Sequence, residues 1–154
     1  MASDKKLTII SKEDAVFWMD GDGIWHNEHG KFEHPKIIQY FNRSIQKDDQ
    51  GYFLSQAIDD RVEKVYFPYE ETAVFAIDLK NSGESIELIL NTFKSVSLNP
   101  EFLYIKNDSL FQDTPEDLIK FSQKALAKLS AKMEDTDKGL TIELGNTQFI
   151  IPEK

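Results

Sequence analysis

The stretch DGDGIWHNEHGKFEHP, residues 20–35, contains all three histidines of the chain and lies between two apolar segments. Its Asp-Gly pairs are typical of a tight hairpin turn, because glycine adopts positive φ angles without a clash at Cβ. We therefore expect strands at 15–20 and 24–27 on either side of the turn. Pro35 follows, and proline is favoured at the first position of a helix. The stretch predicts a hairpin that leads into a helix.

Beyond Pro35, the apolar residues Ile37, Ile38, Phe41 and Ile45 recur at helical spacing, which predicts one helix face directed at a core. The polar segment 46–51 is expected to end this helix, with a strand at 51–56. Three more segments are rich in β-branched and aromatic residues and are bounded by turn residues. These are expected to form a central antiparallel meander from strands at 61–67, 72–79 and 85–91.

The last third of the chain has the same expected order of elements as the first, which suggests an internal repeat. A second helix is expected to begin at Pro115, with Thr114 as its N-cap and acidic residues in its first turn. The residues expected on its buried face are Leu118, Phe121, Ser122, Ala125, Leu129 and Met133. The pairs that match between the two parts are Phe32 with Phe111, Pro35 with Pro115, Phe41 with Phe121 and Gly51 with Gly139.

These patterns predict an α+β protein with two similar halves, each a helix on antiparallel strands, joined by the central meander. We place the halves at residues 1–80 and 81–154. No linker rich in proline, glycine or serine separates them, so close packing into one domain is an open alternative.

The composition limits the classes of function. The 154 residues include 27 acids and 18 bases, a net charge of −9, so nucleic-acid binding is not expected. The absence of cysteine excludes disulfides and thiolate zinc sites. We find no apolar run long enough for a signal peptide or a membrane span. We expect a cytoplasmic protein, monomeric or homodimeric, with no membrane contact and no cofactor.

The three histidines raise the question of a metal site. Asp20 and Asp22 begin like a calcium loop, but the fifth position of that loop, which needs an oxygen ligand, is Ile24, and the sixth, which needs glycine, is Trp25. His26 and His29 are three residues apart, so on a strand they point to opposite faces, and His34 lies at a helix start. We expect turn and cap histidines and no metal. A three-histidine site in a small-molecule enzyme or metal-dependent hydrolase is the alternative.

No nucleophile elbow, phosphate-binding loop or dinucleotide fingerprint occurs in the sequence, which favours a non-enzymatic protein. Tryptophan and tyrosine often lie half-buried at binding surfaces because they combine an apolar ring with a polar group. Trp25 could wall a small pocket or pack in the core. The candidate ligand-binding residues are Trp25, His26, Arg61, Tyr69 and Glu71.

Four lysines recur every fourth residue in the expected second helix. Like charges at that spacing repel one another, so a row of them suggests a docking surface for an acidic partner. The alternative is a solvated helix face. The residues of this candidate partner-binding ridge are Lys120, Lys124, Lys128 and Lys132.

Two segments, DGIWHNEHGKFEHPKIIQYFNRSIQKDDQGYFL at 22–54 and EKVYFPYEETAVF at 63–75, resemble the bacterial family described as domain of unknown function 1285. The resemblance covers residues 20–77. It implies a two-part α+β fold with repeated motifs, no established activity, and a role in binding or signalling. It supplies no catalytic residues. We therefore expect a binding or regulatory protein that acts in signal transduction.

Overall fold

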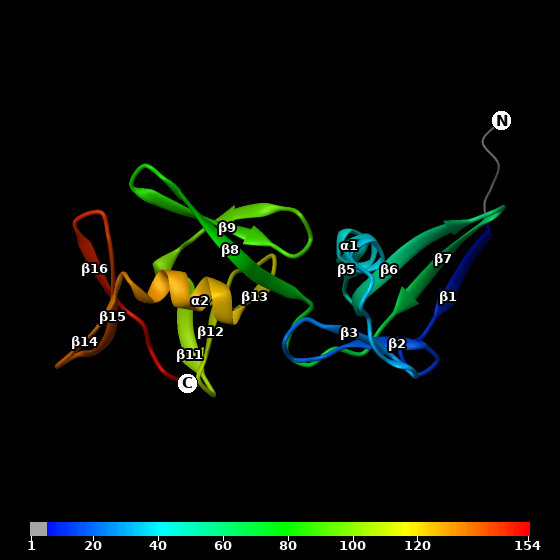
Figure 1. Cartoon of the computed structure of the whole chain (residues 1–154), viewed down its shortest axis with the longest axis horizontal. Helices are drawn as coiled ribbons and strands as arrows, with labels where there is room; N and C mark the ends of the chain where they lie inside the picture. The colour runs from blue at the N-terminus through cyan, green and yellow to red at the C-terminus, as the bar shows by residue number, and fades with distance from the viewer. Residues whose placement is uncertain (1–5) are drawn as a thin grey trace. The chain divides into compact units, whose positions relative to one another are not determined.

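The computed structural model describes residues 6–154 and divides into two compact units (Figure 1). The first runs through Ala73 and the second is Val74–Lys154, so the division comes earlier than the boundary expected after residue 80. Among the described residues, strands predominate and two α-helices are present, which confirms the α+β class.

The first unit contains one helix and seven strands among its described residues. They are β1 (Lys6–Ile10), β2 (Phe17–Met19), β3 (Trp25–Asn27), β4 (Gly30–Lys31), α1 (Pro35–Arg43), β5 (Ile45–Asp48), β6 (Gly51–Ile58) and β7 (Arg61–Tyr66). One sheet has the strand order β1-β7-β6-β5, with β1 parallel to β7, and the other has the order β2-β3-β4.

The predicted hairpin and the start of α1 at Pro35 are confirmed. The backbone N–H groups of Asp22 and Ile24 donate to the Asp20 carboxylate at 2.9 and 3.0 Å, which closes the turn between β2 and β3. The helical pattern expected to include Ile45 was wrong at that residue. Ile45 begins β5, which pairs with β6 across a turn at Gly51 (φ +118°), a conformation suited to glycine.

An aromatic cluster forms the core of the first unit. Trp25 meets Phe67 edge to face with ring centroids 4.7 Å apart, and its ring lies 5.2 Å from that of Phe41 and 5.8 Å from that of Phe17. Phe41 is the part of α1 that reaches these rings. No residue of α1 is itself buried, so the helix lies at the edge of the core.

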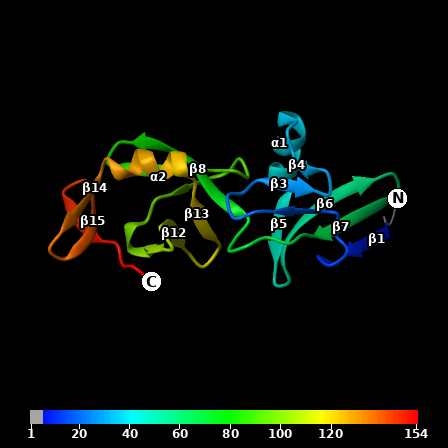
Figure 2. The same cartoon turned by 60° about the horizontal axis from the view of Figure 1, so that its bottom comes forward.

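The second unit contains β8 (Val74–Ser82), β9 (Ser85–Leu90), β10 (Ser95–Ser97), the 3-10 helix η1 (Pro100–Phe102), β11 (Leu103–Lys106), β12 (Ser109–Asp113), β13 (Leu118–Phe121), α2 (Gln123–Ser130), β14 (Met133–Thr136), β15 (Gly139–Leu144) and β16 (Thr147–Ile150). Its large sheet has the order β10-β9-β8-β13-β12-β11, and its small sheet has the order β14-β15-β16. Figures 1 and 2 show α2 beside β8.

The predicted central meander was wrong. β8 and β9 do pair antiparallel, but β7 pairs with β6 and β1 in the other unit. The second edge of β8 is taken by β13 in parallel. A strand that follows β8 by many residues therefore replaces the expected neighbour.

The predicted start of the second helix was also wrong. Leu118–Phe121 is β13, and α2 begins only after Ser122, whose hydroxyl accepts the backbone N–H of Ala125 at 3.2 Å. Ile119 and Phe121 alternate inward as strand residues do. Pro115 is thus not at a helix start, Phe121 is not a helical counterpart of Phe41, and the two-half repeat is not confirmed.

Neither helix of residues 6–154 has the length and apolar character needed to cross a bilayer.

Candidate functional site

The aromatic core of the first unit opens to the surface at a hollow of about 450 Å³. We call it the aromatic hollow, and its lining residues are Ala15, Val16, Phe17, Trp18, Asn27, Glu28, His29, Phe32 and Phe41. The ring of Phe41 lies 5.0 Å from those of Phe17 and Phe32, at interplanar angles of 78° and 77°. The walls therefore face in different directions. Small-molecule sites have volumes of roughly 300–1,000 Å³, so the hollow can accept a ligand.

The polar rim of the aromatic hollow is the turn between β3 and β4. The Asn27 side-chain oxygen accepts the backbone N–H of His29 at 2.9 Å, which sets the turn. The His29 ring nitrogen lies 3.4 Å from a Glu28 carboxylate oxygen, and both side chains are more than four-fifths exposed (83% and 85%). The turn between β3 and β4 can therefore supply a hydrogen-bond acceptor or a negative charge to a ligand.

A second hollow, of about 400 Å³, shares Asn27, His29 and Phe32 with the first. We call it the lateral hollow. It extends to Ile37 on α1, whose side chain is 47% exposed, and it is also lined by Lys31, Glu33 and His34. Its rim therefore carries both signs of charge, unlike that of the aromatic hollow.

Trp18 borders the aromatic hollow, and its ring lies over that of His26, which is bonded to Asp20. Its ring lies parallel to that of His26, at a centroid distance of 5.9 Å, and His26 Nε2 lies 2.7 Å from Asp20 Oδ2. Burial raises the pKa of Asp20, but the hydrogen bonds from His26, Ile24 and Asp22 outweigh it and hold that pKa below its usual value. The Asp-Gly turn thus orients a partly exposed tryptophan.

None of the five predicted ligand-binding residues lines either hollow. Trp25 is 1% exposed and donates from Nε1 to Asn42 Oδ1 at 2.7 Å, so it occupies a core position. Tyr69 packs edge to face on Tyr52 at 5.2 Å.

His26 pairs with Asp20 on the exposed sheet face and reaches the hollow only through Trp18. Arg61 lies near Glu63 beside the β6–β7 turn, and Glu71 is exposed. Sequence reasoning missed the hollow-lining residues Phe17, Phe32 and Phe41 as site candidates, although the concentration of aromatic residues in the first half was their signal.

The three histidines have different polar partners, although His29 and His34 both line the lateral hollow. His26 contacts Asp20, His29 contacts Glu28, and His34 is the N-cap residue of α1, where its side chain makes no capping hydrogen bond. Within residues 6–154, no group of three or more histidine, aspartate or glutamate side chains is placed to hold a metal ion.

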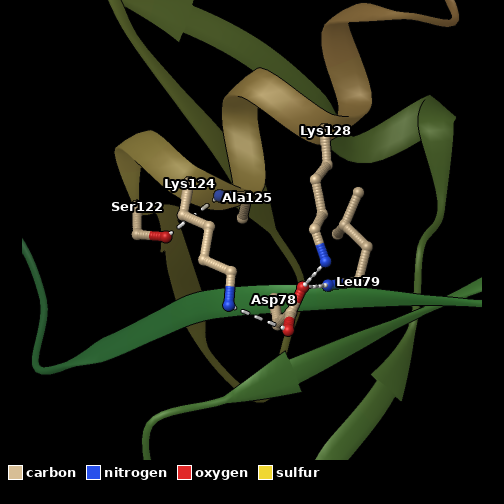
Figure 3. A network of polar contacts seen from close by, with 6 residues as sticks. All are labelled: Asp78, Leu79, Ser122, Lys124, Ala125 and Lys128. Atoms are coloured by element: carbon tan, nitrogen blue, oxygen red, sulfur yellow. Dashed lines mark hydrogen bonds and ion pairs between the residues drawn. The ribbon is translucent and has the colours of Figure 1, made fainter.

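The four lysines of the expected ridge do not share a helix face. Lys124 and Lys128 on α2 both reach Asp78 on β8, at 3.2 and 2.5 Å, as Figure 3 shows. Lys128, the backbone N–H of Leu79 and Lys124 hold the pKa of Asp78 well below its usual value.

The other two lysines of the ridge lie off α2. Lys120 is on β13, with Nζ 5.8 Å from the Phe111 ring centroid, and Lys132 follows the helix. The helical period that defined the ridge was therefore wrong, and a role of these lysines in binding a partner stays a prediction.

A further polar cluster lies on the sheet of the first unit. The Asp48 carboxylate accepts hydrogen bonds from Lys64 at 2.5 Å and from Tyr66 at 2.6 Å, and these bonds lower its pKa to about 2. The same contacts raise the pKa values of Lys64 and Tyr66. All three shifts move away from neutral pH, which suits a structural ion pair and not acid–base catalysis.

Two solved structures resemble the chain. A DUF1285 family protein from Silicibacter pomeroyi DSS-3 superposes with a TM-score of 0.63 at 11% identity, over 96% of this chain and 83% of that one. The fold is that of DUF1285 family proteins. A second such protein, from Shewanella baltica OS155, gives a TM-score of 0.50 at 15% identity, over 70% of this chain and 84% of that one.

The resemblance expected from residues 20–77 is therefore confirmed at the level of the fold and extends over most of the chain. No protein-family model matches the sequence, and no curated protein matches it. At 11% and 15% identity, the two structures show a shared fold and carry no functional residues to this chain.

Proposed function

We propose that the protein is a non-enzymatic binding protein whose ligand site is the aromatic hollow of the first unit. The observation that supports this most is the opening of an aromatic core at a hollow of about 450 Å³ with a polar rim. Apolar walls with a few polar groups are the usual composition of a small-molecule site. Burial of the ligand against the rings would supply affinity, and Asn27, Glu28 and His29 would supply orientation.

A regulatory role follows from where the hollow lies. A ligand there contacts the β2–β3 hairpin and, through Phe41, the helix α1. No residue of α1 is buried, so added contacts at Phe41 would stabilise its docking on the hairpin. We propose that the position of α1 is the change that a signalling partner reads in the cytoplasm.

The alternative, an enzyme or metal-dependent hydrolase that uses the histidine hairpin, has no supporting observation in residues 6–154. Its three histidines do not form a metal site there. Asp48, Lys64 and Tyr66, whose pKa values are shifted by their mutual hydrogen bonds, are not among the residues that line the hollow.

The test is to fill the hollow and measure ligand binding. Ala15 lines it and Ala57 is exposed on β6, so Ala15→Phe blocks the site while Ala57→Phe adds the same ring elsewhere in the unit. With benzyl alcohol as the probe in an NMR titration, we expect saturable shifts at Phe32 and Phe41 in the wild type and in Ala57→Phe. Ala15→Phe should abolish them. Shifts that persist in Ala15→Phe, or no binding by the wild type, would contradict the proposal.

A further inference from the structure

We propose that the aromatic hollow binds a small quaternary ammonium compound, one with a trimethylammonium head like that of choline. This inference rests on the proposed function, because it names the ligand class of the same site. Three aromatic residues line the hollow with rings that pack on one another, Phe17, Phe32 and Phe41, and Trp18, whose side chain lies on the other face of β2, borders it. A cation near a ring face is attracted by the ring quadrupole, and cages of several rings are a known means of recognising quaternary ammonium groups.

The arrangement of the rings suits a rounded cation. Phe41 stands nearly perpendicular to both Phe17 and Phe32, at centroid distances of 5.0 Å. Rings in perpendicular planes present a face and an edge to the hollow in different directions. A trimethylammonium group has methyl groups on several sides, so it contacts more than one wall, whereas a flat ring would use only one.

The charges around the two hollows differ, and those around the aromatic hollow favour a cation. The acidic residue among those that line the aromatic hollow is Glu28, and no lysine or arginine is among its described lining residues. The lateral hollow is lined by Lys31, which would repel a cation. The net charge of −9 also raises the local concentration of cations around the whole chain.

The hydrogen bonds of the rim favour a methylated ammonium over a primary one. A primary ammonium has three N–H donors that lose water on binding and need acceptors. The Asn27 side-chain oxygen already accepts the backbone N–H of His29 at 2.9 Å, which leaves it one lone pair for the three donors of a primary ammonium. A quaternary head has no N–H to satisfy, so it gains ring contacts and the attraction of Glu28 without that cost.

The experiment compares choline with its neutral tert-butyl analogue, which has the same shape without the charge. Both are titrated into the full chain and followed by NMR of the Phe17 and Phe41 side chains. We expect choline to bind about tenfold more tightly than the analogue. Its affinity should fall as salt is added, because Glu28 is exposed and its attraction is screened.

Three variants test which residues cause the preference for choline over its neutral analogue. Glu28→Gln should reduce the preference for choline over the analogue, while Glu33→Gln, which alters the lateral hollow alone, should leave it unchanged. Phe32→Leu keeps an apolar wall and removes a ring quadrupole, so it should weaken choline binding several-fold and leave the analogue almost unaffected.

The outcomes separate this inference from the proposed function. Equal binding of choline and its analogue in the hollow would overturn the inference and leave the hollow as an apolar ligand site. Failure of choline, the analogue and benzyl alcohol to bind would overturn both. A peptide with trimethyl-lysine that binds more tightly than choline would also overturn the assignment to a small compound, because the same head would then be read on a modified chain.

Discussion

Removing the hydrogen bond between Trp25 and Asn42 tests how α1 is attached to the rest of the first unit. Trp25 Nε1 donates to Asn42 Oδ1 at 2.7 Å, and Trp25 is 1% exposed, so water cannot readily replace the acceptor. No residue of α1 is buried, and this bond and the ring contacts of Phe41 attach the helix to the buried Trp25. We predict that Asn42→Ala lowers the free energy of unfolding.

The expected size follows from two opposing terms. A buried donor without an acceptor costs about 1–3 kcal/mol. Alanine recovers about 0.5 kcal/mol of helix propensity relative to asparagine. The net loss for Asn42→Ala is therefore about 0.5–2.5 kcal/mol.

The assay is urea unfolding followed by tryptophan fluorescence, which reports the first unit because both tryptophans, Trp18 and Trp25, lie in it. Gln39→Ala is the matched control, since Gln39 is an exposed residue of the same helix. It should leave stability unchanged or raise it slightly. In a double-mutant cycle, Trp25→Phe removes the donor, so Asn42→Ala should cost less in that background. If Asn42→Ala is as stable as Gln39→Ala, the reasoning is refuted.

Three further predictions concern acid stability, backbone strain and capping. The pKa of Asp48 is about 2 in the folded protein, below the usual value, so its contribution to stability is present above the unfolded pKa and lost as pH falls toward 2. In acid titrations between pH 4 and pH 2, the wild type should therefore lose more stability than Asp48→Asn. Parallel curves for the two proteins would contradict this. Phe93 has φ +69°, a left-handed backbone conformation that asparagine tolerates better than alanine. In urea unfolding, Phe93→Asn should therefore be more stable than Phe93→Ala by about 1 kcal/mol. Equal stabilities would show that the backbone at residue 93 is not strained. Ser122→Ala should cost about 1 kcal/mol and speed amide exchange at Ala125, whereas Thr114→Ala should leave that amide protected; the reverse pattern would support a helix that begins at Pro115.

Local signals in the sequence were sufficient for the hairpin and for the start of α1. The Asp-Gly turn and Pro35 act through the φ angles of single residues, which do not depend on distant contacts. The candidate site was harder to predict from the sequence. Aromatic residues were visible in the first half, but which rings line an open hollow depends on how α1 packs on the hairpin.

The segment 118–121 shows where local pattern is insufficient. Its apolar residues fit both a helical and a strand period, and only pairing with β12 on one side and β8 on the other selects the strand. β8 lies many residues away in the chain, so nothing local to 118–121 carries that information. The same holds for β7, which pairs with β6 and β1 instead of β8.

The positions of the two tryptophans also depend partly on local sequence and partly on tertiary contacts. The sequence by itself determined that 15–20 and 24–27 are strands joined by a turn, and alternation then separates neighbouring side chains onto opposite faces. The register, in which Met19 pairs with Trp25 and Trp18 with His26, decided that Trp25 enters the core and Trp18 remains at the surface. Burial of a sheet face is settled by what packs against it, here Phe41 and Phe67, and those contacts exist only in the tertiary structure.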